Sequence, residues 1–195
     1  MEVKKVGLFG GAFDPPHIGH LILAAEAKAA ANLDEVWFIP SFIPPHLERK
    51  HSKVITNAKA RIEMVRLAIE EEPGFELSLV EYEREGKSYT YDTVTALQHK
   101  HPQHDFYFII GGDMVNDLPK WYRFEELRAS LKFLATSRAG VVTHEIPGVD
   151  IQYFDMPQLE ISSTMIRERH RQGKPWHYFL PKNVKKYIEE IGLYE

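Results

Sequence analysis

Two histidines near the start of the chain, His17 and His20, have a spacing that could do chemistry. On a helix they share one face within a single turn. Gly10 and Gly11 precede them and let backbone amides approach an anionic group closely, and the proline pair that follows begins a helix whose free amides favour phosphate. Because glycines, helix start and imidazoles converge at one point, the pattern favours a phosphate site.

Two other interpretations of this histidine pair stay open. In the first, the pair is structural, with one ring capping the helix and the other packing. In the second, it binds a metal, which needs a third ligand, and the pattern His-Glu-x-x-His is absent. The sequence also lacks G-x-G-x-x-G and G-x-x-x-x-G-K-[ST], so dehydrogenases and P-loop enzymes are without their signatures.

A second stretch, Ile161 to Arg167, reads Ile-Ser-Ser-Thr-Met-Ile-Arg. Ser162 or Ser163 is a good N-cap for the helix expected there. Hydroxyls, free amides and an arginine that project together make an anion site. The alternative is a capped surface helix with an exposed arginine.

Segments typical of strands and helices alternate along the chain between these two stretches. The expected strands are apolar throughout, which favours a parallel sheet covered on both faces. The fold class is therefore α/β: a Rossmann-like doubly wound parallel sheet with helices on both faces and a small C-terminal helical part. Ligands of such sheets bind beyond the carboxyl ends of the strands. The expected strands are 6–9, 36–39, 75–79, 106–110, 132–136 and 151–154, and the expected helices start near His17 and cover 58–71, 91–100, 163–171 and 183–191.

Length and composition exclude several classes of protein. The 195 residues suit one domain, 1–195, with a C-terminal helical subregion over about 161–195. The sequence has no cysteine, which excludes disulfide scaffolds, thiolate metal sites and cysteine nucleophiles and suits a reducing, cytoplasmic location. A net charge of −4 argues against nucleic-acid coating, and no apolar run is long enough for a membrane span. The N-terminus does not resemble a signal peptide.

The first stretch, Gly-Gly-x-Phe-Asp-Pro-x-His-x-Gly-His, resembles the signature of the nucleotidyltransferase superfamily that contains the His-x-Gly-His motif. The resemblance implies that His17 and His20 bind the ATP phosphates and stabilise the transition state of adenylyl transfer. It also implies that Gly10, Gly11 and Phe13 form the nucleotide-binding turn. Between Gly11 and Phe13 this chain has alanine, where the family most often has threonine.

The stretch near the C-terminus is similar to the second motif of the same family, Ile-Ser-Ser-Thr-x-Ile-Arg. This similarity implies that Ser163, Thr164 and Arg167 contact the ATP phosphates opposite the first motif, and that Arg167 joins the two histidines in catalysis. Arg138 stands in Arg-Ala-Gly, which resembles the family's Arg-Pro-Gly near the adenine with the proline replaced by alanine. Arg138 is therefore a candidate for binding ATP.

Three further stretches resemble the family of bacterial nicotinate mononucleotide adenylyltransferases: 88–93, 111–113 and 119–122. The resemblance implies that the nicotinate ring stacks on Trp121, and a flat heteroaromatic ring suits an aromatic partner. It implies that Thr90 and Tyr122 supply backbone amides to the nicotinate carboxylate. Asp113 would bind the ribose or hold the nucleotide end of the site. His46 would belong to the acceptor loop, although leucine replaces the lysine that commonly follows it.

The resemblance implies the transfer of AMP from ATP to nicotinate mononucleotide, giving deamido-NAD and pyrophosphate in NAD biosynthesis. The acceptor phosphate has a second pKa of about 6, so it is already a nucleophile and needs no general base. Mg²⁺ is the implied cofactor, held mainly by phosphate oxygens, and no protein residue is assigned as its ligand. The resemblance allows a homodimer. The alternatives are an enzyme for nicotinamide mononucleotide or another acceptor, and a non-catalytic nucleotide- or metal-binding module.

Overall fold

A six-stranded parallel sheet forms the centre of the computed structural model, which describes residues 2–43, 56–84, 86–137 and 146–194. The strand order is β3-β2-β1-β4-β5-β6, and every neighbouring pair is parallel. The expected α/β doubly wound sheet is therefore confirmed. The strands are β1 (Lys5–Gly11), β2 (Glu35–Pro40), β3 (Phe75–Leu77), β4 (Asp105–Ile110), β5 (Lys132–Thr136) and β6 (Ile151–Phe154).

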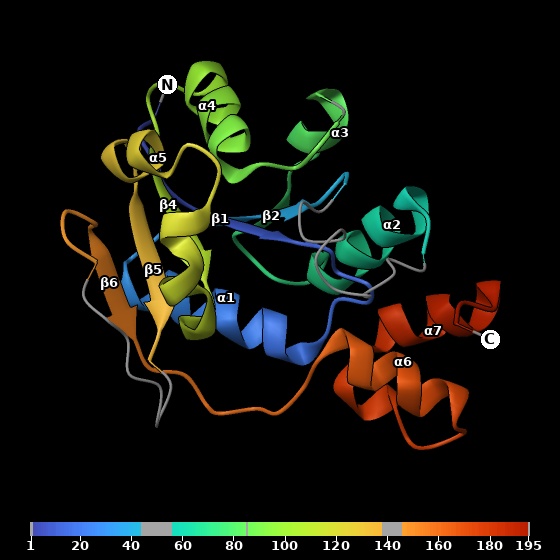
Figure 1. Ribbon diagram of the computed structural model, residues 1–195. Helices are drawn as coiled ribbons and strands as arrows, with labels where there is room; N and C mark the ends of the chain where they lie inside the picture. The colour runs from blue at the N-terminus through green and yellow to red at the C-terminus, as the bar shows by residue number, and fades with distance from the viewer. Residues whose placement is uncertain (1, 44–55, 85, 138–145, 195) are drawn as a thin grey trace.

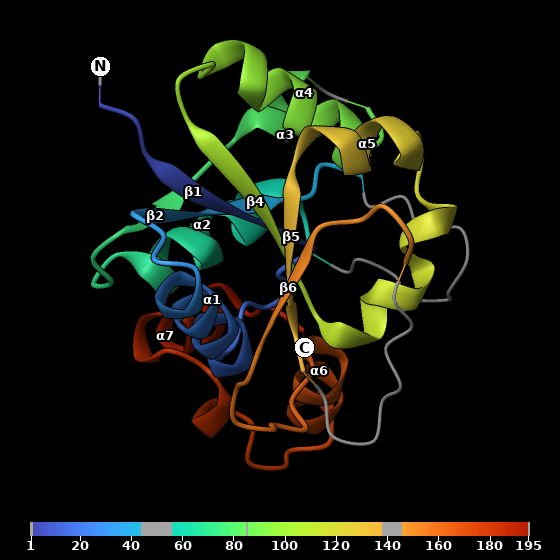
Figure 2. The ribbon, with the colours of Figure 1, turned by 90° about the vertical axis from the view of Figure 1, so that its left-hand side faces the viewer.

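Helices cover both faces of the sheet because its central strands bury side chains on both sides. In β4, Phe106, Phe108 and Ile110 join one apolar cluster, whereas Ile109 joins the other. Figures 1 and 2 show α4 and α5 on one side and α1 on the other. The longer helices of the sheet layers are α1 (Ile18–Ala30), α2 (Ala58–Ile69), α4 (Thr90–Lys100) and α5 (Phe124–Ser130).

The chain reverses its direction of winding between β1 and β4, which are neighbours in the sheet. From β1 the sheet continues outward to β2 and β3, and from β4 it continues to β5 and β6. The carboxyl ends of these two strands carry the glycine pairs Gly10-Gly11 and Gly111-Gly112. A doubly wound sheet binds its ligands at such a switch point. The fold therefore places the first motif at the expected edge of the sheet.

The C-terminal segment consists of α6 (Ser163–Arg171), the short helix η2 (His177–Phe179) and α7 (Lys182–Ile191). Val184 and Ile188 of α7 belong to the same apolar cluster as Met64 of α2. In Figure 1, α2 lies between α3 (Val80–Arg84) and this C-terminal part. The single domain over 1–195 stays a prediction. No helix among the described residues is long and apolar enough to cross a membrane.

Some elements differ from the sequence-based expectation. The bounds of β5, β6 and α6 are those expected, and Leu79, expected in a strand, lies after β3 ends. The sequence analysis did not predict α3, α5 or η1 (Gly112–Lys120). The helix α3 has only five residues, and η1 contains Pro119, so neither offers a helical hydrophobic period. The exposed loop expected over 41–56 lies mostly outside the described residues.

Candidate active site

The turn after β1 is shaped by a buried phenylalanine. Phe13 is 2% exposed, has a positive φ of 48°, and packs its ring against Phe9, Phe38 and His20. A Cβ atom on Gly11 would lie 3.0 Å from the Phe13 ring. A residue without a side chain is therefore needed at position 11 for the Phe13 ring to fold back over the turn.

His17 and His20 face each other at the start of α1. His17 is the N-cap residue, and its backbone N–H donates to Nδ1 of His20 at 3.1 Å. Since Nδ1 of His20 accepts, a neutral His20 carries its proton on Nε2. The two rings stack with centroids 3.7 Å apart, and a Cβ atom on Gly19 would lie 3.0 Å from Nδ1 of His17. The glycine between the histidines thus makes room for the His17 ring.

Both imidazoles are neutral at physiological pH. Burial lowers the pKa of His17 to about 4. Burial, together with the neighbouring His17 ring, lowers the pKa of His20 well below its usual value. Nδ1 of His17 is buried and has no hydrogen-bond partner among the described residues. A purely structural role leaves this atom unexplained, and the described residues offer no group of three ligands for a metal. The pair presents uncharged N–H donors.

The second motif lies against the turn of the first. Ser162 caps α6, since its Oγ accepts from the N–H of Met165 at 3.2 Å. Ser163 Oγ donates to the carbonyl of Pro15 at 2.8 Å. Arg167 Nη1 donates to the carbonyl of Asp14 at 2.6 Å, across 153 positions in the sequence. Two stretches far apart in the chain therefore form one site.

Arg167 is buried, so the alternative of an exposed arginine on a surface helix is wrong. Its exposed fraction is 7%, and Nη2 donates to Thr164 Oγ1 at 3.2 Å. Its Nε is buried without a partner among the described residues. Near the end of the chain, Tyr194 donates its hydroxyl hydrogen to Asp14 Oδ1 at 2.6 Å, and burial together with Asp14 raises the pKa of Tyr194. The turn is therefore held by α6 and by Tyr194, which follows α7.

Candidate acceptor residues lie at the start of α4, in the first turn of η1 and directly after η1. Thr90 is the first residue of α4, so its amide belongs to the free N–H groups of that helix. Asp113 is exposed in the first turn of η1. Trp121 follows η1, is half-buried, and meets Phe108 edge-on at 5.8 Å, with Nε1 buried and unpartnered in the described structure. Tyr122 is 49% exposed.

Two predicted site residues, His46 and Arg138, lie outside the described residues, as do Leu47 and Ala139. The roles of His46 in the acceptor loop and of Arg138 near the adenine stay predictions. Ala12, the third departure from the family pattern, is described. Its carbonyl accepts from Arg61 Nη1 at 3.0 Å, so the turn uses the backbone at this position.

Sequence analysis missed two buried charged residues close to this edge. Arg61 is 2% and Glu81 is 7% exposed, and burial raises the pKa of Glu81. The signal for Arg61 was present, because it falls on the same helical face as the buried Met64, Val65 and Ala68. A charged residue within an apolar stripe needs polar partners, which sequence spacing alone does not name.

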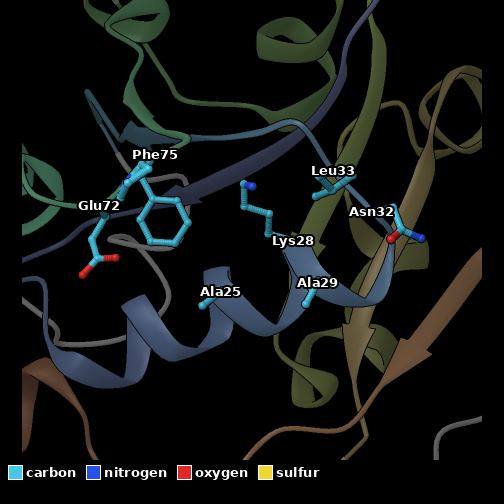
Figure 3. Close-up of a pocket in the computed structure, with 8 residues that line it drawn as sticks. Ala25, Lys28, Ala29, Asn32, Leu33, Glu72 and Phe75 are labelled. Atoms are coloured by element: carbon cyan, nitrogen blue, oxygen red, sulfur yellow. The ribbon is translucent and has the colours of Figure 1, made fainter.

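A surface hollow of about 470 Å³, whose lining residues Figure 3 shows, lies between the C-terminal end of α1 and the segment that enters β3. These segments lie at the amino ends of β2 and β3, whereas the two motifs lie at the carboxyl ends of the strands. The hollow is therefore separate from both motifs. Its lining residues are Ala25, Lys28, Ala29, Asn32, Leu33, Glu72, Pro73 and Phe75.

Comparisons with known proteins agree with this arrangement. The model of the cytidylyltransferase-like family matches residues 8–169. The chain is 49% identical over 193 residues to the nicotinate-nucleotide adenylyltransferase of Bacillus subtilis (strain 168). The aligned region covers 99% of this chain and 100% of that protein. Two solved structures of Plasmodium falciparum nicotinic acid mononucleotide adenylyltransferase, complexed with APC and with NaAD, match with a TM-score of 0.77. Their sequences are 20% and 21% identical to this chain, and each match covers 98% of this chain and 97% of the other. At this identity the two matches show the shared fold.

The family resemblance drawn from the two motifs is thereby confirmed. A family match over most of the chain and 49% identity to a full-length relative point to the same group of enzymes. The chain belongs to the cytidylyltransferase-like family and, within it, to the nicotinate-nucleotide adenylyltransferases, a class of nucleotidyltransferase.

Proposed function

We propose that this chain transfers AMP from ATP to nicotinate mononucleotide, giving deamido-NAD and pyrophosphate in NAD biosynthesis. One observation supports it above the others: Ser163 and Arg167 of the second motif bond to the carbonyls of Pro15 and Asp14 in the first. Two anion-binding stretches thus face one point at the switch of the sheet. The 49% identity to a nicotinate-nucleotide adenylyltransferase over nearly the whole chain supports this substrate pair.

ATP binds at the turn after β1. Gly10, Gly11 and Phe13 form the nucleotide-binding turn, and the proposed role of Arg138 is to bind ATP near the adenine. The neutral His17 and His20 give N–H donors to phosphate oxygens, which requires no charged imidazole. The pKa of both imidazoles lies well below neutral pH, so each ring is neutral and keeps one N–H donor across the physiological range.

The second motif completes the phosphate site. Ser163, Thr164 and Arg167 bind the triphosphate from the side opposite the histidines. A buried guanidinium keeps its charge and presents several donors in a fixed plane. Because Arg167 is anchored to the Asp14 carbonyl, it can meet developing charge without reorganising.

Nicotinate mononucleotide binds at the start of α4, at the first turn of η1 and directly after η1. Trp121 stacks on the ring, and the amides of Thr90 and Tyr122 receive the carboxylate. Asp113 holds the ribose or the nucleotide end, and His46 belongs to the acceptor loop. Amide donors favour a carboxylate over a carboxamide, because a carboxamide places its own NH₂ donor against one of them. This arrangement supports preference for the acid.

The chemistry is a substitution at the α-phosphorus of ATP. A phosphate oxygen of the mononucleotide forms the new bond to the α-phosphorus. The bond from this phosphorus to the oxygen that bridges the α- and β-phosphates breaks, and that oxygen leaves with pyrophosphate. The nucleophile is already ionised near neutral pH, so the protein positions the reactants and stabilises charge. His17, His20 and Arg167 stabilise the charge that passes to the leaving group.

Mg²⁺ is the cofactor of the proposed reaction. The ion would be held mainly by the phosphate oxygens of ATP and by water, and no protein residue is assigned as its ligand. Bound in that way, it would neutralise part of the triphosphate charge. A cytoplasmic location, suited by the cysteine-free sequence, and a homodimer complete the proposal.

The test incubates the purified chain with ATP, Mg²⁺ and one candidate acceptor at a time. Pyrophosphate release and the mass of the dinucleotide are measured together. We expect deamido-NAD from nicotinate mononucleotide. Release with only another acceptor would place the chain with a different substrate of the superfamily. An absence of turnover with every acceptor, together with zinc binding that His17→Ala abolishes, would indicate a non-catalytic module.

A further inference from the structure

Arg61 of α2 joins two parts of the molecule that the proposed reaction must hold in register. Its Nη1 donates to the carbonyl of Ala12, in the turn after β1, at 3.0 Å. Its Nη2 donates to the hydroxyl of Tyr82 at 3.1 Å and lies 3.5 Å from the carbonyl of Phe42. With 2% of its surface exposed, this guanidinium is enclosed by the protein.

The bonds of Arg61 begin where the sheet ends. The last backbone hydrogen bond that links the ends of β1 and β2 runs from the N–H of Ser41 to the carbonyl of Gly11, at 2.8 Å. Ala12 follows Gly11 and Phe42 follows Ser41, and the guanidinium of Arg61 lies between the carbonyls of Ala12 and Phe42. The arginine therefore extends the link between the two segments by one residue beyond the sheet.

From Phe42 the same network reaches the start of α4. The N–H of Phe42 donates to Glu81 Oε2 at 3.2 Å, and Thr93 Oγ1 donates to Glu81 Oε1 at 2.8 Å. Tyr82, next to Glu81, donates its hydroxyl hydrogen to the carbonyl of Ser41 at 3.1 Å. Buried bonds thus run from the helix that begins at Thr90 to the turn that carries the first motif.

Transfer between two bound substrates depends on the distance between their sites. A displacement of about 1 Å between reacting atoms can cost about a hundredfold in rate. A planar guanidinium with donors in a fixed fork holds two carbonyls at a set separation, which a lysine with one point charge does not. A buried charge is costly to keep, so a position like this one calls for a reason other than stability.

We propose that Arg61 is a positioning residue that fixes the ATP-binding turn against the acceptor-binding segments, an inference that rests on the proposed function. Arg61 touches neither substrate. It acts through the Ala12 carbonyl on one side, and through Phe42 and Tyr82 on the other. Loss of the fork leaves each half able to bind its own substrate but no longer aligned.

The dinucleotide product distinguishes alignment from ordinary binding, because it occupies both halves at once. In Arg61→Lys we expect the Kd of a non-hydrolysable ATP analogue and that of nicotinate mononucleotide each to change by less than about threefold. The Kd of deamido-NAD should rise, and kcat should fall, by about tenfold or more. Calorimetry gives the three Kd values, and pyrophosphate release gives kcat.

Arg66→Lys is the matched control, since Arg66 lies on the same helix but pairs at the surface with Glu63 and Glu70. It should leave all four quantities unchanged. Tyr82→Phe removes one partner of Arg61 and should give the same pattern with a smaller change. If Arg61→Lys does not fold, by circular dichroism and Tm, Tyr82→Phe alone decides.

The inference would be overturned if, in Arg61→Lys, the Kd of deamido-NAD rose by no more than the product of the fold-changes in the two substrate Kd values. An unchanged kcat would overturn it as well. The same holds if Arg66→Lys reproduces the pattern. These outcomes require an active wild-type chain, so they differ from failure of the proposed function, in which the wild type releases no pyrophosphate with nicotinate mononucleotide.

Discussion

The phosphate side of the candidate site is built from buried groups with fixed hydrogen bonds, whereas the described acceptor side presents more open aromatic side chains. His17 is 6% and Arg167 is 7% exposed, while Tyr122 is 49% exposed. The ring of Tyr122 packs on that of Tyr89 with the ring centroids 4.6 Å apart, and Trp121 is half-buried. The difference indicates that changes on the phosphate side should lower kcat, and changes on the acceptor side should raise one KM.

The largest effect is expected from His20→Ala. Removal of a neutral donor aimed at developing charge should lower kcat by about a hundredfold or more, or about 3 kcal/mol. Far-ultraviolet circular dichroism should show a preserved fold. His99→Ala, which changes an exposed histidine of α4, is the control and should leave kcat unchanged. A kcat near that of the wild type in His20→Ala would remove this residue from the mechanism.

The buried His17 should make stability depend on pH. Its pKa is about 4 in the folded chain and 6.5 when unfolded, so the unfolded chain binds more protons between these values. The stability that depends on a neutral His17 is fully present above pH 6.5. As the pH falls toward 4, the free energy of unfolding decreases by about 3 kcal/mol at most. Urea unfolding at several pH values should show a shallower dependence in His17→Gln. An equal dependence in both chains would mean that His17 titrates normally.

Trp121→Ala tests the acceptor side. Loss of the stacking surface should raise KM for nicotinate mononucleotide about tenfold, or about 1.4 kcal/mol, and change KM for ATP far less. Trp121→Phe keeps a flat ring, so its KM for nicotinate mononucleotide should lie between that of the wild type and that of Trp121→Ala. Equal increases in both KM values would show that Trp121 supports the fold through Phe108 instead.

The smallest effect is expected from Tyr122→Ala. Its proposed contribution is a backbone amide, which alanine keeps, so KM for the mononucleotide should change by less than about threefold, under about 1 kcal/mol. Steady-state kinetics with saturating ATP measure it. An increase of tenfold would instead make the phenol ring part of the acceptor site and would weaken the contrast between the two sides.

The two motifs could be located from the sequence because the residues of each are contiguous, and their phosphate-binding role stays a prediction. Local rules for helix starts predicted a cap at Ser162 or Ser163 and the bounds of α6, and the structure shows Ser162 as the cap. The parallel sheet follows from apolar runs that alternate with helical periods. The family of the chain followed from the same contiguous motifs.

Contacts that span long distances in the sequence could not be predicted. Arg61 meets Ala12 across 49 positions, and Tyr194 meets Asp14 across 180. Spacing within a helix shows that Arg61 faces inward, but only the packed fold shows which carbonyls it meets. The five-residue helix α3, which supplies Glu81 and Tyr82, is too short to leave a period in the sequence.

The most direct test of the account compares the acid and the amide as acceptors. The measured quantity is kcat/KM for nicotinate mononucleotide and for nicotinamide mononucleotide, from pyrophosphate release at saturating ATP and Mg²⁺. Amide donors aimed at a carboxylate predict a ratio of about tenfold or more in favour of the acid. Equal values, or a higher value for the amide, would contradict the acceptor site proposed for this chain.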